Sequence, residues 1–160
     1  MKTWWCKVFP LFLLLVLIPT LCFSQTKKLP VEIKYEDTDT VGLRLAYQIK
    51  QLIKKSSSLC LSENQSDLRL ILLLMTQDQD PKNPGETSIY SGTIIFAGIY
   101  SNHRWGNYWA NTIFGKVGAD RVQDIAESIV ALSDQEWEKM FKRMKRLDSW
   151  QDKSSKEQPQ

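Results

Sequence analysis

The chain has a single histidine and only three cysteines in 160 residues. Two of the cysteines precede residue 25, within an N-terminal apolar segment, so Cys60 is the only thiol that we expect in the mature protein. A zinc site needs several converging histidine or cysteine ligands, and one thiol forms no internal disulfide. We therefore expect no metal, no cofactor, and a fold that is stabilised by packing alone.

Common catalytic motifs are also missing. The sequence contains no nucleophile-elbow pattern, no HExxH and no phosphate-cradling glycine loop. The acidic stretch at 78–80 does not fit a calcium loop, because Lys82 and Asn83 occupy the positions that need an oxygen ligand and a glycine. We assign no catalytic residue. The alternative is an envelope hydrolase in which His103 acts as the base with an acid such as Asp120.

The N-terminus carries an export signal. Two lysines are followed by "VFPLFLLLVLIPTLCF", sixteen residues without a charge, and then by the polar "SQTKK". This pattern predicts a signal peptide over 1–24 that is cleaved before Gln25, and hence a periplasmic protein. An uncleaved inner-membrane anchor is disfavoured because Pro10 and Pro19 interrupt the segment. Lipid attachment at Cys22 is disfavoured by the bulky Leu21 before it.

The charge balance excludes one class of partner. The whole chain has 21 basic and 18 acidic residues, and two lysines leave with the signal peptide, so the mature protein carries 19 minus 18, or +1. A general nucleic-acid binder needs a strongly positive surface. We therefore expect no nucleic-acid partner. We expect one domain over 25–147, followed by a flexible tail over 148–160.

Apolar periodicity predicts the secondary structure. Alternating or continuous apolar residues indicate strands, and apolar residues three and four apart indicate helices. Asp39 or Thr40 is the expected cap of the first helix, and a capping-box pattern of Ser133 and Glu136 suggests a break in the second. The expected elements are strands at 31–35, 67–76 and 88–100, a helix at 41–55, and a helix from about 120 that breaks near 133 and resumes to 147.

The order strand-helix-strand-strand-helix predicts an α+β fold. We expect a two-layer sandwich with a small mixed or antiparallel sheet and helices mainly on one face. Residues 68–75 and 89–100 are apolar on both sides, whereas a sheet covered on one face should alternate. The second face therefore needs a cover. Its candidates are the aromatic stretch 105–114, the C-terminal helical piece, or another copy of the protein.

The stretch "SNHRWGNYWANTIFGKVGAD", residues 101–120, has two interpretations. We interpret it first as an apolar connection between strand and helix that covers the sheet. The second interpretation is a ligand or partner surface, because flat rings and a guanidinium suit sugars and cations. Its residues would be His103, Arg104, Trp105, Tyr108 and Trp109.

The stretch "KMFKRMKRL", residues 139–147, predicts a basic amphipathic helix. Such a helix can lie on an anionic membrane or envelope polymer. A peripheral membrane-binding module that uses 137–147 is therefore another alternative, with envelope lipid or glycan as the partner. Its basic residues are Lys139, Lys142, Arg143, Lys145 and Arg146.

Three segments carry a resemblance to known proteins. They are "DTDTVGLRLAYQIKQLIKKSSSL", "TSIYSGTIIF" and "GADRVQDIAESIVALSD". Over about residues 31–134 the chain resembles small uncharacterised exported proteins of Gram-negative bacteria. The resemblance implies a periplasmic setting and no activity. Our interpretation is an exported envelope protein that works by binding, as an accessory or inhibitor-type module, with a protein partner or as a homo-oligomer.

Overall fold

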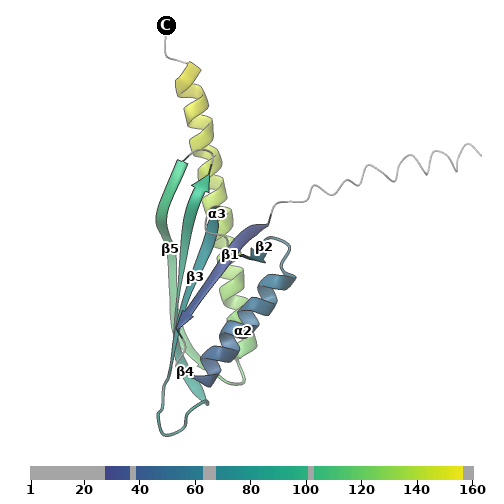
Figure 1. The fold of residues 1–160 in the computed structure, drawn as a ribbon, viewed down its shortest axis with the longest axis vertical. Helices are drawn as coiled ribbons and strands as arrows, with labels where there is room; N and C mark the ends of the chain where they lie inside the picture. Colours follow the sequence, from purple (N-terminus) through teal and green to yellow (C-terminus); the bar gives the residue numbers. More distant parts are fainter. Residues whose placement is uncertain (1–27, 37–38, 63–67, 101–102, 157–160) are drawn as a thin grey trace, which may run out of the picture.

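The computed structural model describes residues 28–36, 39–62, 68–100 and 103–156, which form one five-stranded sheet and two helices (Figure 1). The predicted signal peptide at 1–24 lies outside these residues. Neither helix in the described part of the chain has the length and apolarity that a bilayer crossing requires. The elements are β1 (Leu29–Glu36), α2 (Thr40–Lys55), β2 (Leu59–Leu61), β3 (Arg69–Asp78), β4 (Thr87–Tyr100), β5 (His103–Gly118) and α3 (Val122–Lys156).

The sheet is mixed and its strand order is β2-β1-β3-β4-β5. β1 is parallel to β2 and to β3, whereas β3, β4 and β5 are successively antiparallel. Both helices pack on one face, with α2 and α3 in contact (Figure 1). The α+β fold class and the mixed sheet are therefore confirmed. The sheet has two strands that the sequence analysis did not anticipate, β2 and β5.

The core lies between the helices and the inner face of the sheet. Side chains of β3 and β4 alternate, and their inner members are almost fully buried. Trp137 of α3 packs against Phe96, with ring centroids 6.2 Å apart. The largest buried side chains of this core are Leu45, Ile49, Ile53, Leu70, Leu72, Leu74, Ile94, Phe96, Ile129 and Met144.

A buried aspartate begins α2 and joins it to the sheet. Asp39 is the N-cap, and its Oδ1 accepts hydrogen bonds from the Gly42 backbone N–H at 2.6 Å and from the Ser88 hydroxyl of β4 at 2.7 Å. The cap predicted at Asp39 is confirmed. Gly42 lies so close to β3 that a Cβ atom there would be 1.8 Å from Thr76 Oγ1. The absence of a side chain at Gly42 therefore sets how closely α2 approaches the sheet.

The stretch 101–120 is not a connection, because most of it forms β5. Residues 103–118 pair with β4 along its whole length, and only the tip at 101–102 lies outside the described residues. The expectation was wrong because Gly115, Thr112 and Asn111 interrupt the apolar alternation. An irregularity in the β4–β5 register near Ile94 and Ile95 also shifts the phase of the pattern.

The expected break near residue 133 is also absent, because α3 runs without interruption from Val122 to Lys156. Ser133 is not a cap: its hydroxyl donates to the Ile129 carbonyl one turn earlier. Ser133 and Glu136 are both buried and fill the gap in the apolar stripe between Ile129 and Met140. The apparent change of phase therefore marks two buried polar residues on a continuous helical face.

A partly buried ion pair joins β1 to β3. Arg69 Nε donates to Glu32 Oε2 at 2.8 Å, and Lys34 Nζ lies 3.3 Å from Glu32 Oε1. Burial by itself raises the pKa of Glu32. The hydrogen bonds from Arg69 and Lys34, together with their charges, outweigh that effect and hold this pKa below its usual value of 4.5.

We expect Gly42→Ala to lower the free energy of unfolding by about 1–3 kcal/mol, although alanine is the better helix former, because its methyl group overlaps Thr76. Denaturant unfolding measures the effect. Exposed Leu43→Ala is the control and should change little. Thr76→Gly in the Gly42→Ala background should recover part of the loss. Equal losses for Gly42→Ala with and without Thr76→Gly would contradict the close approach.

We expect the Glu32 pair to stabilise the fold at neutral pH and to lose its effect in acid. Because the folded pKa is depressed, the stabilisation is complete above 4.5 and disappears as the pH falls through the lowered value. Unfolding of wild type and Glu32→Gln should therefore differ at pH 7 and converge below pH 4.5. Glu138→Gln, in an exposed pair with Lys142, is the control. A difference that does not change with pH would contradict this assignment.

Candidate functional site: the outer face of the sheet

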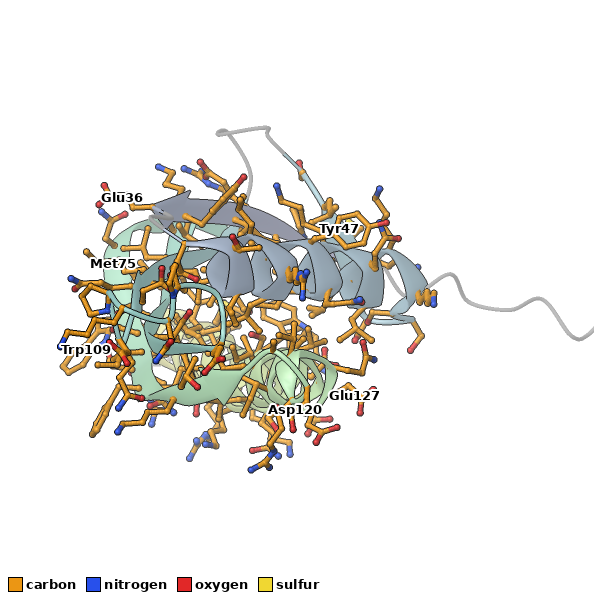
Figure 2. All side chains as sticks on the ribbon, turned by 90° about the horizontal axis from the view of Figure 1, so that it is seen from below. Glu36, Tyr47, Met75, Trp109, Asp120 and Glu127 are labelled. Carbon is orange, nitrogen blue, oxygen red and sulfur yellow. The ribbon has the colours of Figure 1, made fainter. Side chains whose placement is uncertain are left out.

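The face of the sheet that points away from α2 and α3 has no cover among the described elements. Figure 2 shows Glu36, Met75 and Trp109 on this side, away from the helices. The stretch 105–114 was expected as a cover, but its described residues 107–114 extend the sheet within β5. The C-terminal part of α3 lies on the helical side. Neither of the two described candidates therefore covers this face, and a cover by another copy of the protein stays a prediction.

Strand pairing defines the rows of this outer face. Each row crosses β3, β4 and β5 in that order, and alternate residues of each strand contribute to it. We call the apolar members of the four rows the outer apolar face: the exposed Met75, Ile89, Trp109 and Phe114, the partly buried Leu73 and Ile95, and the buried Ile71. The rows are Ile71–Ile95–Trp109, Leu73–Thr93–Thr112, Met75–Ser91–Phe114 and Gln77–Ile89–Lys116.

The third row contains Phe114, the most exposed large apolar side chain of the described residues, and Met75. Phe114 is 83% exposed and Met75 is 57% exposed, with the small Ser91 between them. Ile89, in the next row, is also exposed. Large apolar side chains that gather on one surface typically mark an interaction site. Phe114 and Met75 were not among the predicted site residues, because their place on one row depends on strand pairing.

Trp109 borders the same face. It pairs with Ile95 and is 66% exposed, and its Nε1–H donates to Thr112 Oγ1 at 3.0 Å. The register shift in β5 places residues 109 and 112 on one side, although they are three apart in a strand. The hydrogen bond restrains the indole across the face, where its rings stay accessible.

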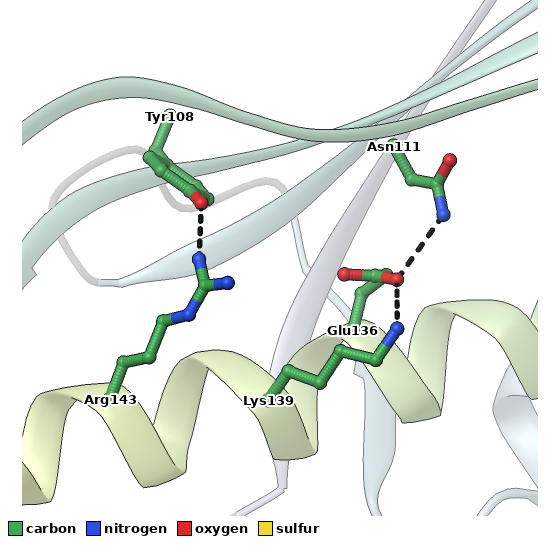
Figure 3. A network of polar contacts seen from close by, with 5 residues as sticks. All are labelled: Tyr108, Asn111, Glu136, Lys139 and Arg143. Carbon is green, nitrogen blue, oxygen red and sulfur yellow. Dashed lines mark hydrogen bonds and ion pairs between the residues drawn. The ribbon is translucent and has the colours of Figure 1, made fainter.

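Tyr108 points to the opposite side of the sheet. It pairs with the core residue Phe96, and its hydroxyl accepts a hydrogen bond from Arg143 Nη1 of α3 (Figure 3). The predicted ligand surface therefore does not form one cluster, since Tyr108 and Trp109 lie on different faces of β5. The backbone of residues 103–105 belongs to β5, whereas the side chains of His103, Arg104 and Trp105 lie outside the described part of the structure.

A buried carboxylate holds β5 against α3. Glu136 Oε1 accepts a hydrogen bond from Asn111 Nδ2 of β5 at 3.2 Å and pairs with Lys139 Nζ at 2.8 Å (Figure 3). Glu136 is almost fully buried, and both of these donors approach the same oxygen. This contact positions the edge strand that carries Phe114 and Trp109. Its role is structural, because the helix and sheet enclose it.

The basic residues of α3 are exposed, but the apolar stripe beside them is not. Met140 and Met144 are buried in the core, and Phe141 is partly buried against Trp137, with ring centroids 5.4 Å apart. The basic residues beside this packed stripe are Lys139, Lys142, Arg143, Lys145 and Arg146. Between residues 137 and 149, Leu147 is the only large apolar side chain that is exposed. An interfacial helix needs its apolar side free to enter the membrane. The folded protein uses that side for its own core.

The hydrolase alternative required His103 near an acid such as Asp120. His103 is the first residue of β5 and Asp120 follows its last residue, so the sixteen residues of the strand separate the two backbones by roughly 50 Å at about 3.3 Å per residue. A base and its partner acid must lie within hydrogen-bonding reach, so this pair does not form a catalytic site. Asp120 instead lines a shallow groove of about 400 Å³ between α2 and the start of α3, beside Leu43 and Tyr47.

Comparisons with known proteins give a weak structural resemblance. No protein-family model and no curated protein matches the chain. A minor lipoprotein from Acinetobacter baumannii is 12% identical, with a TM-score of 0.35 over 66% of this chain and 93% of that one. A hypothetical protein from Chlamydia trachomatis is 11% identical, with a TM-score of 0.33 over 56% and 70%. Rare lipoprotein B from Shewanella oneidensis is 12% identical, with a TM-score of 0.32 over 74% and 98%.

Two of these three structures are named lipoproteins, and all come from bacteria. The chain thus has a weak structural resemblance to these bacterial proteins. Identities near 12% carry no information on activity or ligand. The outer apolar face therefore has to be interpreted from its own geometry.

We expect truncation of Phe114 to affect the free energy of unfolding much less than truncation of Phe96. Phe114→Ala should change the free energy of unfolding by less than about 0.5 kcal/mol in dilute protein, because the ring is exposed. Phe96→Ala should cost about 3–5 kcal/mol, because that ring is buried against Trp137. Chemical denaturation measures both. A large loss for Phe114→Ala would show that its ring supports the fold and is not available to a partner.

Proposed function

We propose that this protein is an exported, non-catalytic binding module of the periplasm, an accessory protein that engages its partner with the outer apolar face. The observation that carries this proposal is the exposed Met75–Ser91–Phe114 row on a side of the sheet that no described element covers. The export signal at 1–24 supports the location.

The fold makes this surface available at little cost to stability. The inner face of the sheet and the two helices already form a continuous core, which includes neither Phe114 nor Met75. Their apolar area remains in water, where its removal on binding contributes about 25 cal/mol for each Å². A partner that covers these side chains therefore gains free energy without disturbing the core.

The chemistry of the face favours a protein partner. From Ile71 to Met75 on β3 and from Thr112 to Phe114 on β5, its outward side chains are aliphatic, aromatic or hydroxyl groups without charge. Lys116 and the β1 residues Lys34 and Glu36 lie at its borders. An uncharged centre with aromatic residues and a charged border is the usual composition of a protein interface. An anionic polymer would need charges at the centre.

A photo-crosslinking experiment in exporting cells tests the proposal. A benzoylphenylalanine residue at position 114 should crosslink to protein, because it lies within the binding surface. The same residue at Ala131, which is exposed on α3, is the matched control and should give little product. A second arm introduces Met75→Asp into the position-114 probe and should abolish the crosslink while far-UV circular dichroism stays unchanged. Equal crosslinking from positions 114 and 131 would sink the proposal.

A further inference from the structure

We infer that the molecule that covers the outer apolar face is a second copy of this chain, packed face to face about a two-fold axis that runs along β4. This inference rests on the proposed function, because it names the partner of the same surface. An axis along β4 places β5 of each copy over β3 of the other and keeps every row at its own level.

The Met75–Ser91–Phe114 row is complementary to itself under this symmetry. The two copies of Ser91 meet at the axis, where their small size lets the sheets approach. On either side, Phe114 of one copy lies over Met75 of the other. The two most exposed outward side chains of this row thus cover each other twice in one dimer. A ring against a methionine thioether is a favourable contact.

The polar groups also match under the same axis. Lys116 faces the partner's Gln77, a neutral side chain that can accept a hydrogen bond from its ammonium group. Lys34 and Glu36 of β1 project beyond the partner's β5 edge and remain in water, where they need no partner. Within the four rows, no two like charges are brought together.

A different position of the axis is less favourable. An axis between β3 and β4 would place β5 over the partner's β1 and set Phe114 against Glu36, which would desolvate a carboxylate without a counter-charge. Packed sheets are rotated by about 30° from alignment. At one strand spacing from the axis, about 4.8 Å, this rotation moves a residue by only roughly 2–3 Å. That is less than half of the distance between rows, so the pairing of rows survives.

The size of the face predicts a reversible dimer. Three strands and four rows cover roughly 14 Å by 20–25 Å, or about 300–350 Å² of sheet plane on each copy. The rings of Trp109 and Phe114 project from this plane, so the accessible area that the dimer would bury exceeds the plane area. The total for both copies therefore approaches the roughly 1,000 Å² at which specific interfaces begin. We therefore expect a dissociation constant of roughly 1–100 μM, as for small interfaces.

Sedimentation equilibrium of the purified exported protein, with Cys60→Ser to exclude disulfide exchange, tests the inference. Wild type should show a monomer–dimer equilibrium, and Phe114→Lys and Met75→Glu should each raise the dissociation constant at least tenfold. A mixture of the two variants should associate more tightly than either alone. Its heterodimer has one Lys–Glu contact and one unchanged Phe–Met contact, which is a prediction specific to this symmetry. Glu127→Lys, an exposed change on α3, should have no effect.

Two outcomes overturn the inference. The first is a wild-type protein that stays monomeric well above the expected dissociation constant, and the second is a variant mixture that associates no better than its components. The photo-crosslinks in cells separate this failure from that of the proposed function. A product between position 114 and a different protein would leave the binding module in place with another partner. Absence of any specific product at position 114 would end both.

Discussion

Two helices pack against one face of a sheet that is apolar on both faces. This arrangement determines which apolar side chains of the protein are buried and which stay exposed. α2 and α3 enclose the inner side chains of β3 and β4, which are almost completely removed from water. Two helices cannot also reach the opposite face. Removal of apolar surface from water is the main driving force of folding and of association. Apolar side chains that stay exposed on the sheet would therefore gain free energy if another surface covered them. The exposed outer apolar face, the surface that we propose for binding, is a consequence of how this core is completed.

Buried polar contacts set where the helices sit. Asp39 receives hydrogen bonds from its own helix and from Ser88 of β4, and Glu136 receives one from Asn111 of β5. Each carboxylate therefore links a helix to a strand distant in sequence. Such contacts are directional, whereas apolar packing is not. The contact between Asn111 and Glu136 fixes the orientation of the edge strand β5 against α3.

The two faces of β5 have different roles. Residues that point inward meet α3, as Tyr108 meets Arg143, and residues that point outward stay accessible, as Phe114 and Trp109 do. The irregularity in its pairing with β4 permits both. Because strand side chains alternate, one edge strand can complete the core and present a surface for binding. A face-to-face dimer would cover the outward side with the same kind of contact that covers the inward side.

The α+β class, the helix at 41–55 with a cap at Asp39 or Thr40, and the excess of apolar residues in the two central strands could all be predicted before the structure, because they depend on local periodicity and capping. The sequence also predicted that the second face of the sheet needs a cover. Three features could not be predicted in this way: residues 103–118 form a strand, the methionines of α3 belong to the core, and Met75 and Phe114 share a row. These features depend on pairing between distant segments and on buried polar contacts. The sequence shows which residues alternate along one strand. It does not show the register between strands, which decides which residues are neighbours on one face of the sheet.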